Sequence, residues 1–157
     1  MNLHSRLQQR RFRSAAAEAL VSVMVAADHF VQASGAICAD HGVTGDQYNV
    51  LRILRGAHPS GHARSEIARR LVRRSPDVTR LLDRLERVGF VRRERGPEDS
   101  RQSVARITKK GLVLLETLDP QIDRLMEAIA KPLKDGDLRT LARLCSALVS
   151  SQQEYLL

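Results

Sequence analysis

One pattern constrains the fold of this chain most. It consists of two helix signals that are separated by a tight turn and followed at once by a β-hairpin pattern. A short helix is expected over residues 63–72. After the turn, Ser75 is suited to be an N-cap, Pro76 the first helical position and Asp77 an acidic residue of the first turn. Gly89 is a C-terminal stop. Two helices joined in this way predict a helix-turn-helix.

The segment after Gly89 has the pattern of a hairpin. Residues 90–95 and 103–108 are short runs that contain β-type residues. The residues between them, 96–102, are charged and turn-forming, although this loop is longer than the favoured two residues. A hairpin directly behind a helix-turn-helix is a wing. The sequence therefore predicts a winged helix-turn-helix lobe over residues 44–108.

Long apolar helices are expected on both sides of this lobe. Residues 5–40 are expected to form one helix, Thr44 caps a second that runs to about Arg55, and residues 112–157 have apolar side chains at helical spacing. These helices are more apolar than a small winged domain can cover, which predicts a homodimer interface. The expected fold is mainly α, in a single domain over residues 1–157, with 5–40 and 112–157 as dimerisation helices.

The excess positive charge of the chain is confined to one block. Residues 62–110 contain 15 Lys+Arg and 7 Asp+Glu, whereas the rest of the chain contains 11 of each. Such confinement favours a polyanionic partner. Aromatic residues make up 3% of the chain and Trp is absent, which argues against stacking platforms for single strands. Double-stranded DNA is therefore the expected partner.

The second helix of the motif carries the side chains that are expected to read bases. Arg80 and Arg84 lie one turn apart and each can bind guanine in a bidentate manner, while Thr79 can contact a thymine methyl group or a phosphate. Asp77 either caps the helix, which is favoured, or accepts a hydrogen bond from cytosine. The alternative for this face is a solvated surface with Arg–Asp pairs.

The strands and the loop of the hairpin complete the expected DNA interface. Arg101 at the wing tip is placed to enter the minor groove, and Asp99 to hold the shape of the hairpin. The strand arginines are expected to contact phosphates, with an ordinary exposed strand as the alternative. The full set of expected DNA contacts is Ser75, Pro76, Asp77, Thr79, Arg80, Arg84, Arg92, Arg93, Arg95, Asp99 and Arg101.

A family pattern covers the same residues. Residues 75–93 are followed by an Asp-x-Arg signature at Asp99 and Arg101, and then by residues 108–111, a Thr after a strand with a Gly shortly behind it. On these residues, the stretch 42–111 resembles the multiple-antibiotic-resistance regulator (MarR) family of winged-helix repressors. The resemblance implies a cytoplasmic homodimer with intertwined terminal helices. It also implies a repressor that leaves a palindromic operator when a small ligand binds or a cysteine is oxidised.

The resemblance also implies a ligand pocket where the first, second and fifth helices meet. The polar residues in suitable registers are Asp28, His29, His41 and Arg52. One His or Arg that faces an apolar cleft can orient a carboxylate, so a small aromatic, phenolic or carboxylate effector is expected. For each of the four residues, the alternative is a surface or structurally satisfied side chain.

Two alternatives to ligand control remain open at this stage. Cys38 is a candidate thiol switch, although its neighbours Asp40 and His41 give no clear reason for a lowered thiol pKa. The other alternative is an architectural DNA-binding protein without an effector, which would bind most sequences alike. No metal site, cofactor motif or catalytic pattern is recognised, so no enzyme is expected. No apolar run is expected to span a membrane, and the lack of a CxxC pair favours the cytoplasm.

Overall fold

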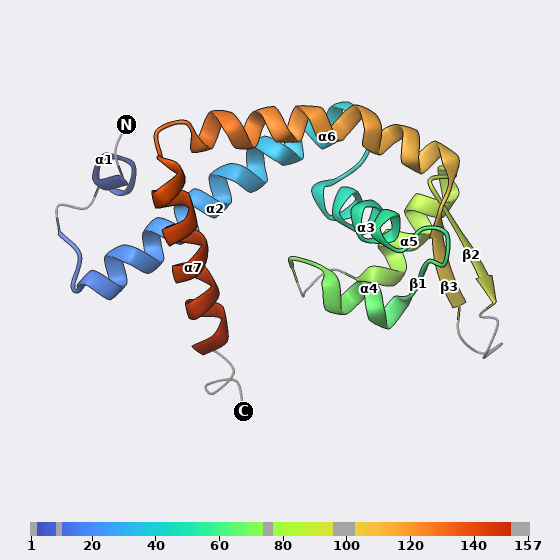
Figure 1. Cartoon of the computed structure of the whole chain (residues 1–157), viewed down its shortest axis with the longest axis horizontal. Coiled ribbons are helices and arrows are strands. Elements are labelled where there is room, and N and C mark those ends of the chain that lie inside the picture. The colour runs from blue at the N-terminus through green and yellow to red at the C-terminus, as the bar shows by residue number, and fades with distance from the viewer. Residues whose placement is uncertain (1–2, 9–10, 74–76, 96–102, 152–157) are drawn as a thin grey trace. The chain divides into compact units, whose positions relative to one another are not determined.

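The computed structural model describes residues 3–8, 11–73, 77–95 and 103–151 (Figure 1). They belong to two compact units, Met1–Ile122 and Asp123–Leu157. The first unit contains the three strands and every helical segment up to Ile122, and the second contains the helical segments from Asp123 onward. Each unit is described by itself.

The N-terminal segment contains two helices where one was expected. α1 spans Leu3–Leu7 and α2 spans Ala15–Asp40, so the prediction of a single helix over residues 5–40 is wrong. The reason is local. Ser14 has an extended backbone, and its side chain accepts a hydrogen bond of 3.1 Å from the N–H of Ala17, which makes it an N-cap.

α2 is more apolar than the sequence analysis allowed. It has 26 residues and contains an 18-residue window of mean hydropathy 1.4, so by length and composition alone it could cross a membrane. The expectation that no segment reaches this threshold is therefore wrong. A soluble helix that packs against a partner passes the same test, and Leu20, Met24 and Val31 of α2 are exposed in the single chain.

The helices of the lobe follow the predicted order. α3 spans Gly45–Gly56 and begins at a capping box, in which the Thr44 side chain accepts from the backbone of Gln47 and the Gln47 side chain accepts from the backbone of Thr44. α4 spans Arg64–Arg70 and α5 spans Val78–Arg87. Figure 1 shows these three helices grouped beside the sheet.

The predicted hairpin is confirmed and is joined by a third strand. β2 (Val91–Arg95) pairs in an antiparallel manner with β3 (Ser103–Ile107), in a register that places Val91 opposite Ile107. β1 (His62–Ala63) pairs with the other edge of β3, giving the order β1-β3-β2. The sequence analysis missed β1, because a strand of two residues carries no periodic signal.

The core of the first unit lies between α3, α5, the sheet and the N-terminal part of α6 (Lys109–Ala130). Leu51, Leu54, Leu85 and Leu115 are fully buried there. The second unit contains the rest of α6 and α7 (Asp135–Ser151). Its exposed large apolar side chains are Met126, Ile129, Leu133, Leu141, Leu144, Leu148 and Val149.

Candidate nucleic-acid interface

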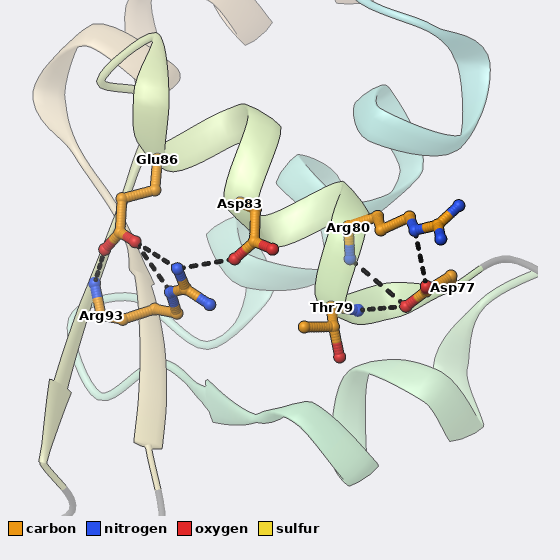
Figure 2. Close-up of polar contacts among 6 residues, drawn as sticks. All are labelled: Asp77, Thr79, Arg80, Asp83, Glu86 and Arg93. Carbon is orange, nitrogen blue, oxygen red and sulfur yellow. Dashed lines mark hydrogen bonds and ion pairs between the residues drawn. The ribbon is translucent and has the colours of Figure 1, made fainter.

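The N-terminus of α5 is capped by Asp77. One carboxylate oxygen of Asp77 accepts hydrogen bonds from the backbone N–H groups of Thr79 (3.1 Å) and Arg80 (3.3 Å), and the other lies 3.3 Å from the Arg80 Nε (Figure 2). The helix begins at Val78, so the predicted start with a Ser75 cap is wrong. Ser75 and Pro76 themselves lie outside the described residues. Both carboxylate oxygens of Asp77 contact groups at the start of α5. The geometry therefore supports the capping role of Asp77, which the sequence analysis favoured.

α5 separates a buried face from an exposed cationic face. Val78, Leu82 and Leu85 are buried in the core. On the other side, the Arg80 side chain is 80% exposed and Arg84 is also exposed. Arg80 and Arg84 are four residues apart, so they lie on the same side of the helix. This arrangement places both arginine side chains on the exposed side of α5, and their contact with bases stays a prediction.

Arg93 was expected to contact phosphate, but its side chain lies against two carboxylates of α5. Its Nε and terminal nitrogen donate to the same oxygen of Glu86, at 2.8 and 2.5 Å. The same terminal nitrogen lies 2.7 Å from Asp83 Oδ1. The hydrogen bonds from Arg93 lower the pKa of the Glu86 carboxyl, and the hydrogen bond to Glu86 raises the pKa of Arg93. The sequence analysis missed this cluster, which fastens β2 to α5.

The other wing residues are only partly described. The Arg92 Nε lies 3.1 Å from Glu94 Oε1, and the Arg92 side chain is 62% exposed. Glu94 also lies 3.2 Å from the Nε of Arg106 on β3. The backbone of Arg95 belongs to β2, whereas its side chain, Asp99 and Arg101 lie outside what the structure describes. The expectations for these three side chains therefore remain predictions.

A hollow of about 350 Å³ lies where α4, α5 and the sheet meet. Thr79, Leu82 and Arg93 are among its lining residues. The exposed side of the helix-turn-helix is therefore concave beside the wing. None of the four residues that were expected to bind a ligand lines this hollow.

The expected ligand residues on α2 are exposed. Asp28 lies 3.4 Å from the guanidinium of Arg6 and accepts a hydrogen bond of 2.9 Å from the side chain of Gln32. His29 is exposed beside it. Both residues therefore match the alternative to ligand binding, in which they are ordinary surface side chains.

The two other expected ligand residues contact side chains of α6 or α3, although Arg52 is exposed like the pair on α2. His41 is half-buried, and its Nε2 lies 2.9 Å from the side-chain nitrogen of Gln121 on α6. The guanidinium of Arg52 lies over the ring of Tyr48, 5.9 Å from its centroid. The four residues thus have different neighbours.

A polar cluster between α3 and α6 was not foreseen. The Tyr48 hydroxyl donates a hydrogen bond of 2.6 Å to Asp119, and Arg55 donates to the other carboxylate oxygen. Burial and the hydrogen bond to Asp119 raise the pKa of Tyr48 to about 12. Burial would raise the pKa of Asp119, but the hydrogen bonds from Tyr48 and Arg55 outweigh it and lower that pKa. The sequence around Asp119 contains other polar residues, such as Glu116 and Gln121, so nothing in it marks Asp119 as a buried partner.

The start of α6 holds the C-terminal end of α5. The Thr108 hydroxyl donates to the carbonyl of Gly89 (2.8 Å), and the Lys110 ammonium donates to the carbonyl of Val88 (2.8 Å). Gly111 passes so close that a Cβ there would lie 2.5 Å from the carbonyl oxygen of Phe90. These contacts give a structural reason for the Thr-x-x-Gly pattern of residues 108–111.

Cys38 is in a poor position for redox chemistry. Its side chain is fully buried, and burial raises the pKa of the thiol. A reactive cysteine requires an accessible thiolate, which both properties oppose. Among the described residues, no group of three or more His, Cys, Asp or Glu side chains is placed to hold a metal ion.

A capped helix with exposed arginines, a preceding short helix and an adjacent three-stranded wing define a winged helix-turn-helix protein. Residues 43–103 match the MarR family. A MarR transcription factor from Planctomyces limnophilus has a solved structure that is 35% identical to this chain, with a TM-score of 0.66, and the match covers 87% of this chain and 99% of that one. The chain belongs to the MarR family.

Further comparisons agree with this assignment. The HTH-type transcriptional regulator TtmR of Methylorubrum extorquens is 39% identical over 98 residues, which are 62% of this chain and 49% of TtmR. The chain spans about half the length of such curated relatives. The MepR–DNA complex of S. aureus has the same fold, with a TM-score of 0.74 at 21% identity over 90% of this chain and 99% of that one.

Proposed function

We propose that this protein is a transcriptional regulator that binds double-stranded DNA, with α5 in a major groove and the wing beside the adjacent minor groove. The observation that carries the proposal is the exposed face of α5, on which Thr79, Arg80 and Arg84 lie on a capped helix. A major groove accepts one helix, and arginine pairs with guanine there. The names of the relatives, which are transcriptional regulators, support the same function.

The proposal includes a homodimer. Exposed apolar side chains on α2, α6 and α7 supply surface that a second copy would cover. We assign residues 5–40 and 112–157 to this interface and the whole chain to one functional domain. A two-fold dimer would read half-sites of a palindromic operator about 34 Å apart.

A cytoplasmic location follows from the same proposal. If α2 crossed a membrane, Glu18 and Asp28 would lie within or near the hydrocarbon, where carboxylates are costly. Packing of α2 against a second copy needs no such burial of charge. The apolar composition of α2 is therefore better explained by the dimer.

We further propose that the protein represses transcription and releases DNA when a small aromatic, phenolic or carboxylate ligand binds. The family assignment supports this regulation. Of the proposed ligand residues Asp28, His29, His41 and Arg52, His41 has the most suitable surroundings, because it is half-buried beside Gln121 of α6, whereas the other three are exposed. The buried Cys38 gives the thiol-switch alternative no support.

Fluorescence anisotropy on the DNA upstream of the protein's own gene tests the proposal. We expect binding that is much tighter than on a scrambled duplex, and release by one of a series of aromatic carboxylates and phenols added with reductant present. Arg84→Ala should weaken binding to the specific duplex by about 1–3 kcal/mol and change scrambled-duplex binding much less. Equal affinity of the wild-type protein for both duplexes would refute sequence-specific regulation and support the architectural alternative.

A further inference from the structure

Glu86 is the centre of the contact between the wing and α5. Its Oε1 accepts the backbone N–H of Arg93 at 2.9 Å, and its Oε2 accepts from two nitrogens of the Arg93 guanidinium (Figure 2). Glu86 thereby fixes both the main chain and the side chain of one residue of β2. Asp83, one turn earlier on α5, lies against the same guanidinium at 2.7 Å. One arginine of the wing is thus held at two positions along α5.

This cluster differs from an ordinary surface ion pair. Isolated exposed pairs contribute little to stability, whereas networks and two-point contacts of arginine with carboxylates contribute more. The Arg93 side chain is only 30% exposed. Its position is also fixed by the backbone hydrogen bond to Glu86. The cluster is therefore suited to set the distance between β2 and α5.

The two carboxylates are unexpected on electrostatic grounds. The partner that we propose is a polyanion, and α5 is the helix that approaches it. Removing a negative charge from such a helix should strengthen binding if the charge acts only through space. If Glu86 instead holds the wing in position through its contacts with Arg93, removing its charge should weaken binding.

We propose that Glu86 is a positioning residue for DNA recognition, which acts through Arg93 to hold the wing at the spacing from α5 that lets both elements enter their grooves together. The inference rests on the proposed DNA-binding function. It changes the role of Arg93 from a phosphate contact to a link between α5 and β2. Glu86 itself touches no DNA in this arrangement.

Loss of a negative charge alone should strengthen DNA binding, whereas loss of the contact that positions the wing should weaken it. This difference in sign gives a direct test. Glu86→Gln removes the charge but keeps the size and an amide oxygen that can accept from the backbone of Arg93. Glu66→Gln on α4 is the matched control, because Glu66 is 30% exposed, close to the 36% of Glu86, and among the described residues pairs only with arginines of its own helix. Both full-length variants are titrated by anisotropy against the upstream duplex and a scrambled duplex over a range of salt concentrations.

We expect Glu66→Gln to bind the upstream duplex as the wild type does or slightly more tightly. Glu86→Gln should bind it about tenfold more weakly, as expected when a charge-assisted contact that organises the interface is lost. Its binding to the scrambled duplex should be unchanged or slightly tighter. A role in stability alone would instead weaken both duplexes alike and lower the unfolding midpoint.

A second variant keeps the test independent of any folding defect in the first. Arg93→Gln should weaken specific binding by the same factor as Glu86→Gln, and the double variant should be no weaker than either, because the two residues act as a unit. Arg93→Lys should recover part of the loss. The slope of log K against log salt should stay at the wild-type value, whereas loss of a phosphate contact lowers it by about 1.

Three results would overturn the inference while leaving the proposed function in place. They are tighter or equal specific binding by Glu86→Gln relative to Glu66→Gln, equal weakening of both duplexes by Glu86→Gln, and a reduced salt slope for Arg93→Gln. If the wild-type protein did not prefer the upstream duplex to the scrambled one, the proposed function would fail and the inference would fail with it.

Discussion

Replacement of Asp119 by alanine tests how α3 is fastened to α6. The hydroxyl of Tyr48, a residue that is 8% exposed, would lose its acceptor, and an unsatisfied buried polar group costs about 1–3 kcal/mol. The Arg55 side chain is 38% exposed, so water can replace its lost partner and the further cost is about 0–1 kcal/mol. We therefore expect Asp119→Ala to lower the free energy of unfolding by about 1–4 kcal/mol.

The cost of Asp119→Ala should also depend on pH with a defined sign. The pKa of Asp119 is lowered in the folded state, because the hydrogen bonds from Tyr48 and Arg55 outweigh the effect of burial. The carboxylate therefore stabilises the fold fully above its unfolded pKa of about 3.9, and this contribution is lost as the pH falls through the folded value below it. The difference between the variant and the wild type should be constant from pH 7 to about 5 and shrink in more acidic solution.

Urea unfolding followed by circular dichroism at one fixed protein concentration measures these differences, since a dimer makes stability depend on concentration. Tyr48→Phe in the same background should reduce the cost of Asp119→Ala by about 1 kcal/mol, because no hydroxyl is then left without an acceptor. Glu116→Ala is the control and should stay within about 0.5 kcal/mol of the wild type. A cost of Asp119→Ala that is the same with and without the Tyr48→Phe substitution, or that is unchanged at a pH of about 3, would refute the reasoning.

Three other perturbations have expected outcomes. Gly61→Ala should destabilise the protein by about 1–3 kcal/mol in urea unfolding, because φ of Gly61 is +74° and the added Cβ would lie 2.3 Å from a carbonyl oxygen of β3. Gly56→Ala is the control and should not destabilise the protein in this way, because its added Cβ would lie in open space. Thr44→Ala removes the cap of α3 and should cost about 1 kcal/mol by the same measurement. In a Cys145→Ser variant, the buried Cys38 should react with a thiol reagent only after denaturation, and rapid reaction in the native state would contradict its burial.

The elements with local signals could be predicted from the sequence. The cap at Thr44 and the stop at Gly89 each act within a few residues, and both lie where the structure ends or begins a helix. The start of α2 at Ser14 has the same kind of signal, but the absence of Pro and Gly over residues 5–34 favours a continuous helix and conceals it. For α5, a Ser-Pro-Asp sequence offers two caps, and the structure uses the Asp.

The contacts that hold α5, the wing and α6 together could not be predicted from such local signals. Tyr48 and Asp119 are 71 positions apart, and nothing local says that an Asp on α6 will meet a Tyr on α3. Glu86 and Arg93 are only seven positions apart, yet they belong to different elements. In a block with 15 Lys+Arg, periodicity cannot say which arginine faces DNA and which faces a carboxylate. That choice depends on the packing of β2 against α5.

These contacts also limit how DNA release can occur. α5 is joined to β2 through Glu86 and Arg93, and to the start of α6 through Thr108 and Lys110. A helix held along its length and at its C-terminal end does not bend or turn independently of its neighbours. In the regulation that we propose, a ligand that changes the spacing of two such helices in a dimer would therefore displace each lobe as a whole. The same reasoning supports the role proposed for Glu86, a side chain that would affect DNA binding without touching a base.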